Sequence, residues 1–227
     1  MLTKFKRELI IPFKLEFDLL IRNKNRWLQP LLFFFMLIIL FPIGLGHAQA
    51  TSPLLWPTLI WMSASLAILW SSESIFQFEL EHGAIEQIIL SPYPLWLWLM
   101  IKGLAYWMII GLSLSILGPL LAMIMGLPKT ASLTLGVSLL IGTPGLCLMS
   151  IAASSIILSI KNNGLLLILM MLPLYIPFLI LGVGSVNMSL MQLSPTAQLA
   201  WLGAFTILIA LLAPVIGAQG IKFSLDN

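Results

Sequence analysis

The sequence predicts an all-α integral membrane protein with six transmembrane helices, and its composition is the first sign of that class. Hydrophobic residues make up 60% of the 227 residues, and charged residues only 8%. Soluble globular domains carry roughly 25% charged residues, so a chain with so little charge is suited to lipid. A membrane β-barrel would instead show short segments of alternating apolar and polar residues. We therefore expect a single helical membrane domain over 1–227.

Six apolar runs support this class. A span takes about 20 residues, because a helix rises 1.5 Å per residue across a hydrocarbon core of about 30 Å. The runs are 31–45, 54–71, 95–117, 133–160, 165–184 and 199–219. Gly118 and Pro119 follow the third run, and more apolar residues come after them, which predicts a kink or a short extra helix there.

Basic residues predict the orientation, since Lys and Arg favour the cytoplasmic side. Seven of the eleven precede the first span. Six spans return the C-terminus to the same side, together with Lys161 and Lys222, and Lys102 lies near the inner end of the third span. Only Lys129 falls outside. We therefore expect both termini in the cytoplasm.

The spans and the segments between them give the expected division of the chain. It consists of an interfacial helix over 2–28, spans 1–2 over 31–72, a cytoplasmic segment over 73–94, spans 3–6 over 95–219 and a cytoplasmic tail over 220–227.

The N-terminal segment has the pattern of a helix that lies in the membrane interface. Phe5, Leu9, Phe13 and Phe17 recur at four-residue spacing, with basic residues among them. Such a stripe buries its apolar side among the lipid headgroups. The alternative is a charged tail that only sets the topology.

The segment 73–94 is the main candidate for a site, because its stretch 79–92 holds three of the eight acidic residues: Glu79, Glu81 and Glu86. Its apolar residues keep helical spacing, and Gly83 interrupts them. We expect two short helices with a turn at His82–Gly83, which pack an apolar stripe on the bundle and turn their carboxylates to the cytoplasm. A soluble partner would dock there. The alternatives are a solvated loop or a catalytic carboxylate pair, although nothing nearby suggests a substrate pocket.

Glu73 and Lys102 form a second candidate, a possible intramembrane ion pair. Both lie near the inner ends of neighbouring spans. A charge in hydrocarbon costs roughly 2.5–3.5 kcal/mol on insertion scales unless it pairs or reaches the interface. We expect the two side chains to approach each other; the alternative is that each reaches the interface separately.

The sequence shows no catalytic constellation and no metal site. The single Cys147 and the two histidines are far apart. His47 lies in the predicted outer loop, where a solvated histidine is the plain interpretation. There is no G-x-x-x-x-G-K-[ST] loop, so ATP hydrolysis would need a separate chain. Prolines at 144, 173 and 177 interrupt the helical hydrogen bonds inside predicted spans, so these helices should face other helices.

Several motifs resemble a known family. The pattern E-x-E-x-G-x-x-E over 79–86, followed by S-P, resembles the cytoplasmic loop of type-2 ABC transporter permeases. LFPIGLG at 40–46, IGTPGL at 141–146, LPLYIPFLI at 172–180 and GAIEQIILSPYPL at 83–95 are similar to segments of the cytochrome c maturation permeases, the haem exporter protein B (CcmB) family.

The resemblance implies a complex in the bacterial inner membrane. Its ATPase, a CcmA-like subunit, would dock on the coupling residues Glu79, Glu81, Gly83, Glu86 and Gln87. Other implied partners are a CcmC-like haem-handling membrane protein, a CcmD-like single-span subunit and a CcmE-like periplasmic haem chaperone. Haem would be a substrate of the complex, which would either export haem or release the haem-loaded chaperone. His47 in the predicted outer loop is then a weak candidate for an axial haem ligand. The alternatives are an exporter permease for another substrate and a membrane scaffold that transports nothing.

Overall fold

The regular secondary structure of the described residues is entirely helical. The computed structural model describes residues 16–17, 21, 24–45, 53–72, 74–76, 79–80, 83, 85, 88, 90, 93–157 and 164–225. Its elements are α2 (Lys24–Leu45), α4 (Leu55–Ser72), α7 (Leu95–Tyr106), the π-helical turn η1 (Trp107–Gly111), α8 (Leu112–Ile124), α9 (Lys129–Ile156), α10 (Gly164–Leu190) and α11 (Thr196–Leu225). No strand occurs within these ranges, which agrees with the predicted all-α class.

Five described helices are long and apolar enough to cross a membrane. They are Trp27–Gly44, Leu95–Ile124, Lys129–Ile156, Leu169–Leu190 and Thr196–Phe223. The 18 residues of α4 are not among these five, and its sequence mixes serines, Pro57 and tryptophans with the apolar residues. The structure therefore supports a multi-pass membrane protein, while the count of six spans stays a prediction.

The first long helix begins earlier than predicted. α2 starts at Lys24, so the last residues assigned to an interfacial helix over 2–28 belong to the first long helix, whose candidate span begins at Trp27. The apolar run alone marks only the hydrocarbon-crossing part, and a helix can continue beyond it because charged side chains at its end reach the headgroups. Most of the interfacial segment lies outside the described residues, so that helix remains a prediction.

The third span also differs from the expectation. Helical structure continues past Pro119 to Ile124, so a short extra helix after that proline is wrong, whereas a kink at Pro119 stays a prediction. The irregularity lies earlier, at η1. There the indole of Trp107 lies against Gly111, where a Cβ would overlap it, and donates from Nε1 to Thr143 Oγ1 at 3.0 Å. The π-helical turn packs against α9, and the local sequence does not reveal it.

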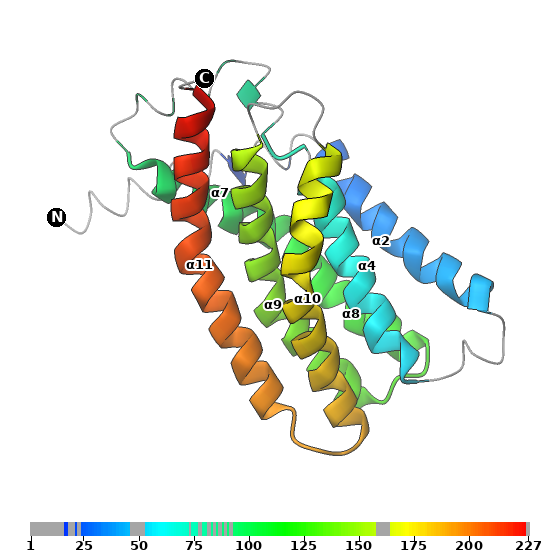
Figure 1. The fold of residues 1–227 in the computed structure, drawn as a ribbon. Coiled ribbons are helices and arrows are strands. Elements are labelled where there is room, and N and C mark those ends of the chain that lie inside the picture. Colours follow the sequence, from blue (N-terminus) through cyan, green and yellow to red (C-terminus); the bar gives the residue numbers. More distant parts are fainter. Residues whose placement is uncertain are drawn as a thin grey trace.

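The centre of the bundle is α9. It packs against α11, α10, α8, α4, α7 and η1, and Figure 1 shows it between α10 and α11 while α2 lies at the outer edge. In α9, 72% of a membrane-length stretch is buried, against 17% in α2 and in α11. Small residues allow this close packing: Gly142 lies against Trp61, and Gly145 against Phe178. The expectation that the Pro144 helix faces other helices is confirmed. For α10, which holds Pro173 and Pro177, only 33% of a membrane-length stretch is buried, so the same expectation holds for only part of that helix.

Hydroxyl groups join the central helices. Ser150 lies 2.5 Å from the Tyr175 hydroxyl, which links α9 to α10. Ser154 donates to the carbonyl of Ser72 at 2.9 Å, and Trp61 Nε1 donates to Ser138 Oγ at 3.1 Å, so both links reach from α9 to α4. Interhelical hydrogen bonds of this kind support packing where lipid gives helices no hydrophobic reason to associate.

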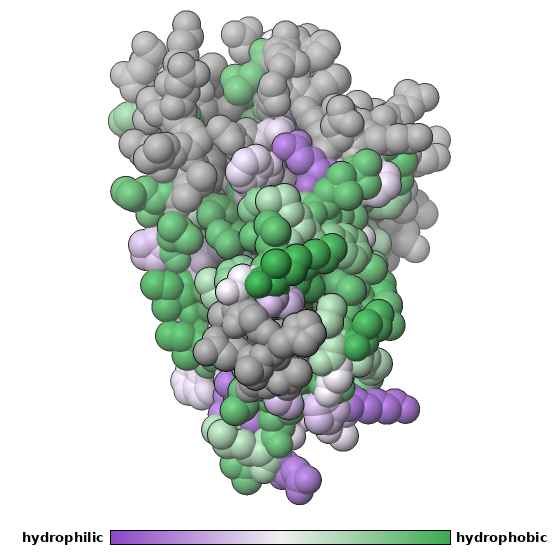
Figure 2. Space-filling model, turned by 90° about the vertical axis from the view of Figure 1, so that its right-hand side faces the viewer, coloured by the Kyte–Doolittle hydropathy of each residue, from purple (hydrophilic) through white to green (hydrophobic). Residues whose placement is uncertain are grey.

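The outside of the described helices carries many large apolar side chains, among them Ile43, Leu169 and Leu211. Figure 2 shows this for the side that carries α2, where green side chains dominate the middle of the described surface. The start of α2, the end of α4, the start of α7 and the end of α11 lie at one end of the bundle, which we call the upper end after Figure 1. The connections that follow α2, α8 and α10 lie at the opposite end. The described helices therefore run alternately up and down.

Candidate functional site

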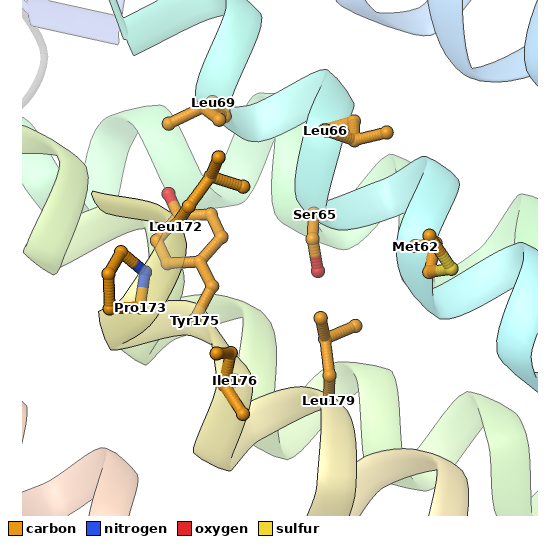
Figure 3. Close-up of a pocket in the computed structure, with 9 residues that line it drawn as sticks. All are labelled: Met62, Ser65, Leu66, Leu69, Leu172, Pro173, Tyr175, Ile176 and Leu179. Carbon is orange, nitrogen blue, oxygen red and sulfur yellow. The ribbon is translucent and has the colours of Figure 1, made fainter. Parts of the chain in front are cut away.

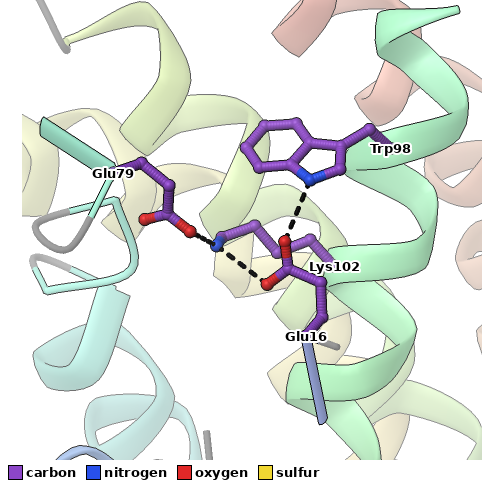
Figure 4. A network of polar contacts seen from close by, with 4 residues as sticks. All are labelled: Glu16, Glu79, Trp98 and Lys102. Atoms are coloured by element: carbon purple, nitrogen blue, oxygen red, sulfur yellow. Dashed lines mark hydrogen bonds and ion pairs between the residues drawn. The ribbon is translucent and has the colours of Figure 1, made fainter. Parts of the chain in front are cut away.

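The candidate site is a buried charge cluster toward the upper end of the bundle, formed by Glu16, Glu79, Trp98 and Lys102 (Figure 4). Helix α7 positions two of its members. The extended backbone of Pro94 precedes the first turn of α7. Trp98 and Lys102 follow four residues apart, so their side chains share one face of the helix.

Lys102 lies between two carboxylates. Its Nζ is 3.2 Å from Glu16 Oε2 and also forms an ion pair with Glu79 Oε1. Trp98 completes the ring of contacts, because its Nε1 donates to Glu16 Oε1 at 2.9 Å. Glu16 thus bonds two residues of α7 at once, one with each of its oxygens.

Aromatic rings cover the ammonium group. Lys102 Nζ lies 5.4 Å from the centre of the Phe76 ring and 5.2 Å from that of Trp98. The two rings are themselves 5.9 Å apart. A cation within about 6 Å of a ring is attracted to its negative face. Phe76 also brings the segment after α4 against the start of α7.

All three charged residues are buried: Lys102 and Glu79 are 4% exposed and Glu16 is 8% exposed. Removing a charge from water is costly unless a partner and further hydrogen bonds compensate. Lys102 obtains two carboxylate partners and Glu16 obtains a lysine and an indole. Among the described residues, nothing bonds to Oε2 of Glu79.

The arrangement is better suited to connecting segments of the chain than to catalysing a reaction. No group of three His, Cys, Asp or Glu residues that could hold a metal occurs in the described part of the chain. The cluster instead ties together three segments that are distant in the sequence: the N-terminal segment, the segment after α4, and α7. A displacement of any one of them has to move a buried charge or carry the other two along.

The predicted coupling residues meet different outcomes. The expectation that the carboxylates of 73–94 face the cytoplasm is wrong for Glu79, because Lys102 draws its side chain into the bundle. Gly83 lies in a turn with φ +61°, as the predicted break at that residue requires. Glu81, Glu86 and Gln87 lie outside the described residues.

The second candidate pair is only half described. Lys102 is buried and paired near the start of α7, but its described partners are Glu79 and Glu16. Glu73 lies outside the described residues, so its approach to Lys102 stays a prediction. The same holds for His47 as a haem ligand.

Sequence reasoning missed Glu16. The residue stands next to Phe17, at the edge of the predicted apolar stripe, in a segment where basic residues outnumber acidic ones. A carboxylate beside a membrane-facing stripe signals a buried partner, yet several basic side chains were equally near in the sequence. Only the packing of the segment on α7 identifies Lys102 as that partner.

Comparison with known proteins identifies the family. The family model described as CcmB protein matches residues 7–224. The chain belongs to the CcmB protein family. It is 41% identical to Heme exporter protein B of Pseudomonas aeruginosa over 212 residues, which cover 93% of this chain and 95% of the relative. Heme exporter protein B of Escherichia coli strain K12 is 34% identical over 214 residues, covering 94% and 97% of the two chains. The protein of that name in Rhodobacter capsulatus is 35% identical over 195 residues, covering 86% and 89%. The resemblance seen in the sequence is thereby confirmed.

Proposed function

We propose that this chain is the membrane-spanning subunit of a haem-export system that serves cytochrome c biogenesis. The observation that carries the proposal is similarity over nearly the whole chain to proteins named Heme exporter protein B. The described helices fit the membrane role, since five of them are long and apolar enough to span a bilayer. We place the protein in the bacterial inner membrane with both termini in the cytoplasm.

ATP hydrolysis would drive this system from a separate subunit, because the sequence has no phosphate-binding loop. A CcmA-like ATPase would dock on the coupling segment through Gly83, Glu81, Glu86 and Gln87. The charge cluster gives this segment a route into the bundle: Glu79 precedes the docking residues and is buried against Lys102 of α7. Movement of the docked segment would reach α7 through that ion pair.

The other partners would be a CcmC-like haem-handling protein, a CcmD-like single-span subunit and a CcmE-like periplasmic chaperone. Haem is a substrate of the assembled complex in this proposal. The complex either exports haem or uses ATP hydrolysis to release the haem-loaded chaperone.

Complementation tests the function. The chain is expressed in a Pseudomonas aeruginosa strain that lacks its own Heme exporter protein B, and covalent haem in c-type cytochromes is measured by haem staining. Restored staining is expected. Normal membrane levels of the chain without any staining would contradict the proposal.

A charge reversal tests the coupling. Glu81→Lys with Glu86→Lys should weaken copurification of the ATPase subunit, because like charges would then meet a basic partner surface. Lys222→Glu, a charge reversal in the last turn of α11, is the control and should leave copurification unchanged. Full copurification and full cytochrome maturation in the double variant would show that the ATPase subunit does not dock through these two glutamates.

A further inference from the structure

The third long helix changes its backbone pairing halfway along its length. It consists of α7, η1 and α8, and at η1 the backbone N–H of Leu112 donates to the carbonyl of Trp107, five residues earlier instead of four. A π-helical turn of this kind often lies at a functional site. It divides the helix into an upper half, α7, and a lower half, α8.

The upper half is attached to the charge cluster and to α4. Trp98, Lys102 and Tyr106 stand four residues apart on one face of α7. The first two bond to the carboxylates of the cluster, and the Tyr106 hydroxyl bonds to that of Ser71, near the end of α4. A movement of the coupling segment therefore acts on α7 along one whole face.

The lower half packs on α9 through rigid groups. At Gly136 of α9, an added Cβ would lie 3.2 Å from the Pro119 ring of α8 and 3.7 Å from the carbonyl of Ser115. At Gly118 of α8, an added Cβ would lie 2.8 Å from Leu139 of α9. A proline ring and a backbone carbonyl cannot turn aside as a long side chain can. α8 and α9 therefore hold each other in place.

The upper half meets α9 through softer groups. At Gly103 of α7, an added Cβ would meet Leu148 and Ile151 of α9, in both cases at the end of a flexible side chain. Such ends can change rotamer. A shift of α7 against α9 therefore costs less than a shift of α8.

Helix α4 shows the same division. Its lower part is fixed, because Trp61 lies directly against Gly182 of α10. Higher up, a pocket of about 260 Å³ separates residues 62–69 of α4 from 172–179 of α10. Figure 3 shows the lining side chains on either side of this gap. The end of α4, which is bonded to Tyr106, therefore has room to follow α7.

Hydroxyl groups keep the backbone satisfied at the turn. Ser113 Oγ donates to the carbonyl of Ile109 at 2.6 Å, and Ser115 Oγ donates to that of Gly111 at 2.8 Å. In a membrane helix, side-chain donors can satisfy backbone groups that lose their regular partners. The carbonyls of η1 therefore keep a partner if the backbone pairing changes.

A side chain of η1 also holds the turn to α9. The indole of Trp107 folds over Gly111, where an added Cβ would overlap it, and donates from Nε1 to Thr143 Oγ1 at 3.0 Å. This bond fixes the position of the turn and leaves the segment above it able to rotate.

We propose that η1 is a hinge in the third long helix. α7 turns about it together with the coupling segment, while α8 stays on α9. The hinge confines the movement to the upper half of the bundle, whereas a continuous α-helix would carry it to the opposite end. The inference rests on the proposed function, because the docked ATPase subunit supplies the movement.

Hydrogen exchange in the purified full-length chain tests the hinge without a partner. The amides of 108–112 should exchange about tenfold faster than those of 116–122, since a hinge opens locally at low cost. Equal exchange in the two stretches would overturn the proposal.

A variant at the turn sharpens this measurement. Thr143→Val removes the acceptor of Trp107 and should speed exchange at η1 about threefold further, the factor that corresponds to an average interhelical hydrogen bond. Thr134→Val is the matched control on α9, because it removes a hydroxyl that bonds to Ser189 at 3.2 Å. The control should leave exchange at η1 unchanged, and an equal effect of both variants would contradict the hinge. Trp107→Phe removes the donor instead and replaces Thr143→Val if that variant does not fold.

Distances between spin labels test the movement in the complex with the ATPase subunit. Trp96→Cys with Leu169→Cys reports on α7, and Ile116→Cys with Ile180→Cys reports on α8; all four positions are exposed. The buried Cys147 is replaced by alanine in every variant. Singly labelled chains identify any distance between copies.

The two label pairs should respond differently to a non-hydrolysable ATP analogue. Trp96 lies about 16 Å along the helix from Trp107, so a rotation of about 15° moves it by about 4 Å. The α7 pair should shift by about this amount, and the α8 pair should not. Equal shifts in both pairs, or no shift in either, would overturn the hinge. Failure of the proposed function shows differently, as loss of the ATPase subunit on purification, and hydrogen exchange in the chain alone then decides the hinge.

Discussion

The charge cluster and the hydroxyl groups of α9 bury polar atoms in different ways. Lys102 depends on carboxylates from two segments that are 86 and 23 positions away in the sequence. Ser150 and Ser154 each donate to the carbonyl four residues earlier in their own helix. Each hydroxyl also contacts a neighbouring helix, α10 in the case of Ser150 and α4 in the case of Ser154. The cluster therefore exists only in the assembled bundle, whereas α9 satisfies its hydroxyls as soon as it is helical. Loss of one member should accordingly cost far more in the cluster than in α9.

Removal of the central charge should have the largest effect. Lys102→Met leaves two buried carboxylates without their cation, which should lower the free energy of unfolding by about 3–5 kcal/mol. Unfolding in detergent, followed by circular dichroism, measures it. Lys129→Met is the control, because Lys129 is exposed and should change stability little. A loss equal to that of the control would show that the cluster does not hold the fold together.

Neutralising one carboxylate should cost less than removing the lysine. Glu79→Gln keeps the shape of the side chain, and Lys102 keeps Glu16 as a partner. The expected loss is about 1.5–3 kcal/mol, the range for a hydrogen bond to a charged group. The same unfolding measurement applies, and Lys102→Met with Glu79→Gln should cost less than the sum of the two single changes. Strict additivity would contradict a direct interaction.

The close packing of α4 and α10 can be tested at two glycines of α10. A methyl group at Gly182 would overlap Trp61, so Gly182→Ala should destabilise the bundle by about 1–3 kcal/mol. At Gly184 only Gln198 Cγ lies near, 3.8 Å from an added Cβ. Gly184→Ala should therefore stabilise slightly, because alanine favours the helix. Thermal unfolding of the two variants should shift in opposite directions; an unfolding temperature of Gly182→Ala at or above that of wild type would show that Trp61 yields.

A hydroxyl of α9 should show the smallest effect. Ser150→Ala removes the link to Tyr175, and interhelical hydrogen bonds in membrane proteins average about 0.6 kcal/mol. A double-mutant cycle with Tyr175→Phe isolates this link. A coupling energy as large as the cost of Lys102→Met would remove the distinction between the two regions.

Patterns within single segments predicted much of this protein. The composition gave its class, and the apolar runs located the helices to within several residues, because burial in lipid depends mainly on local hydropathy. The break at Gly83 was also visible, since a glycine there permits φ +61°. The motifs at 40–46, 83–95, 141–146 and 172–180 indicated the family, which the comparisons confirm.

Only the tertiary structure decided which groups meet. The sequence indicated that Lys102 needs an acidic partner and suggested Glu73, whereas the described partners that packing brings to it are Glu16 and Glu79. The π-helical turn at Trp107 likewise contacts a neighbouring helix, through Thr143 on α9. The physical reason is that hydropathy and backbone preference act within a few residues, whereas an ion pair, a bulge or a cavity depends on how separate helices pack.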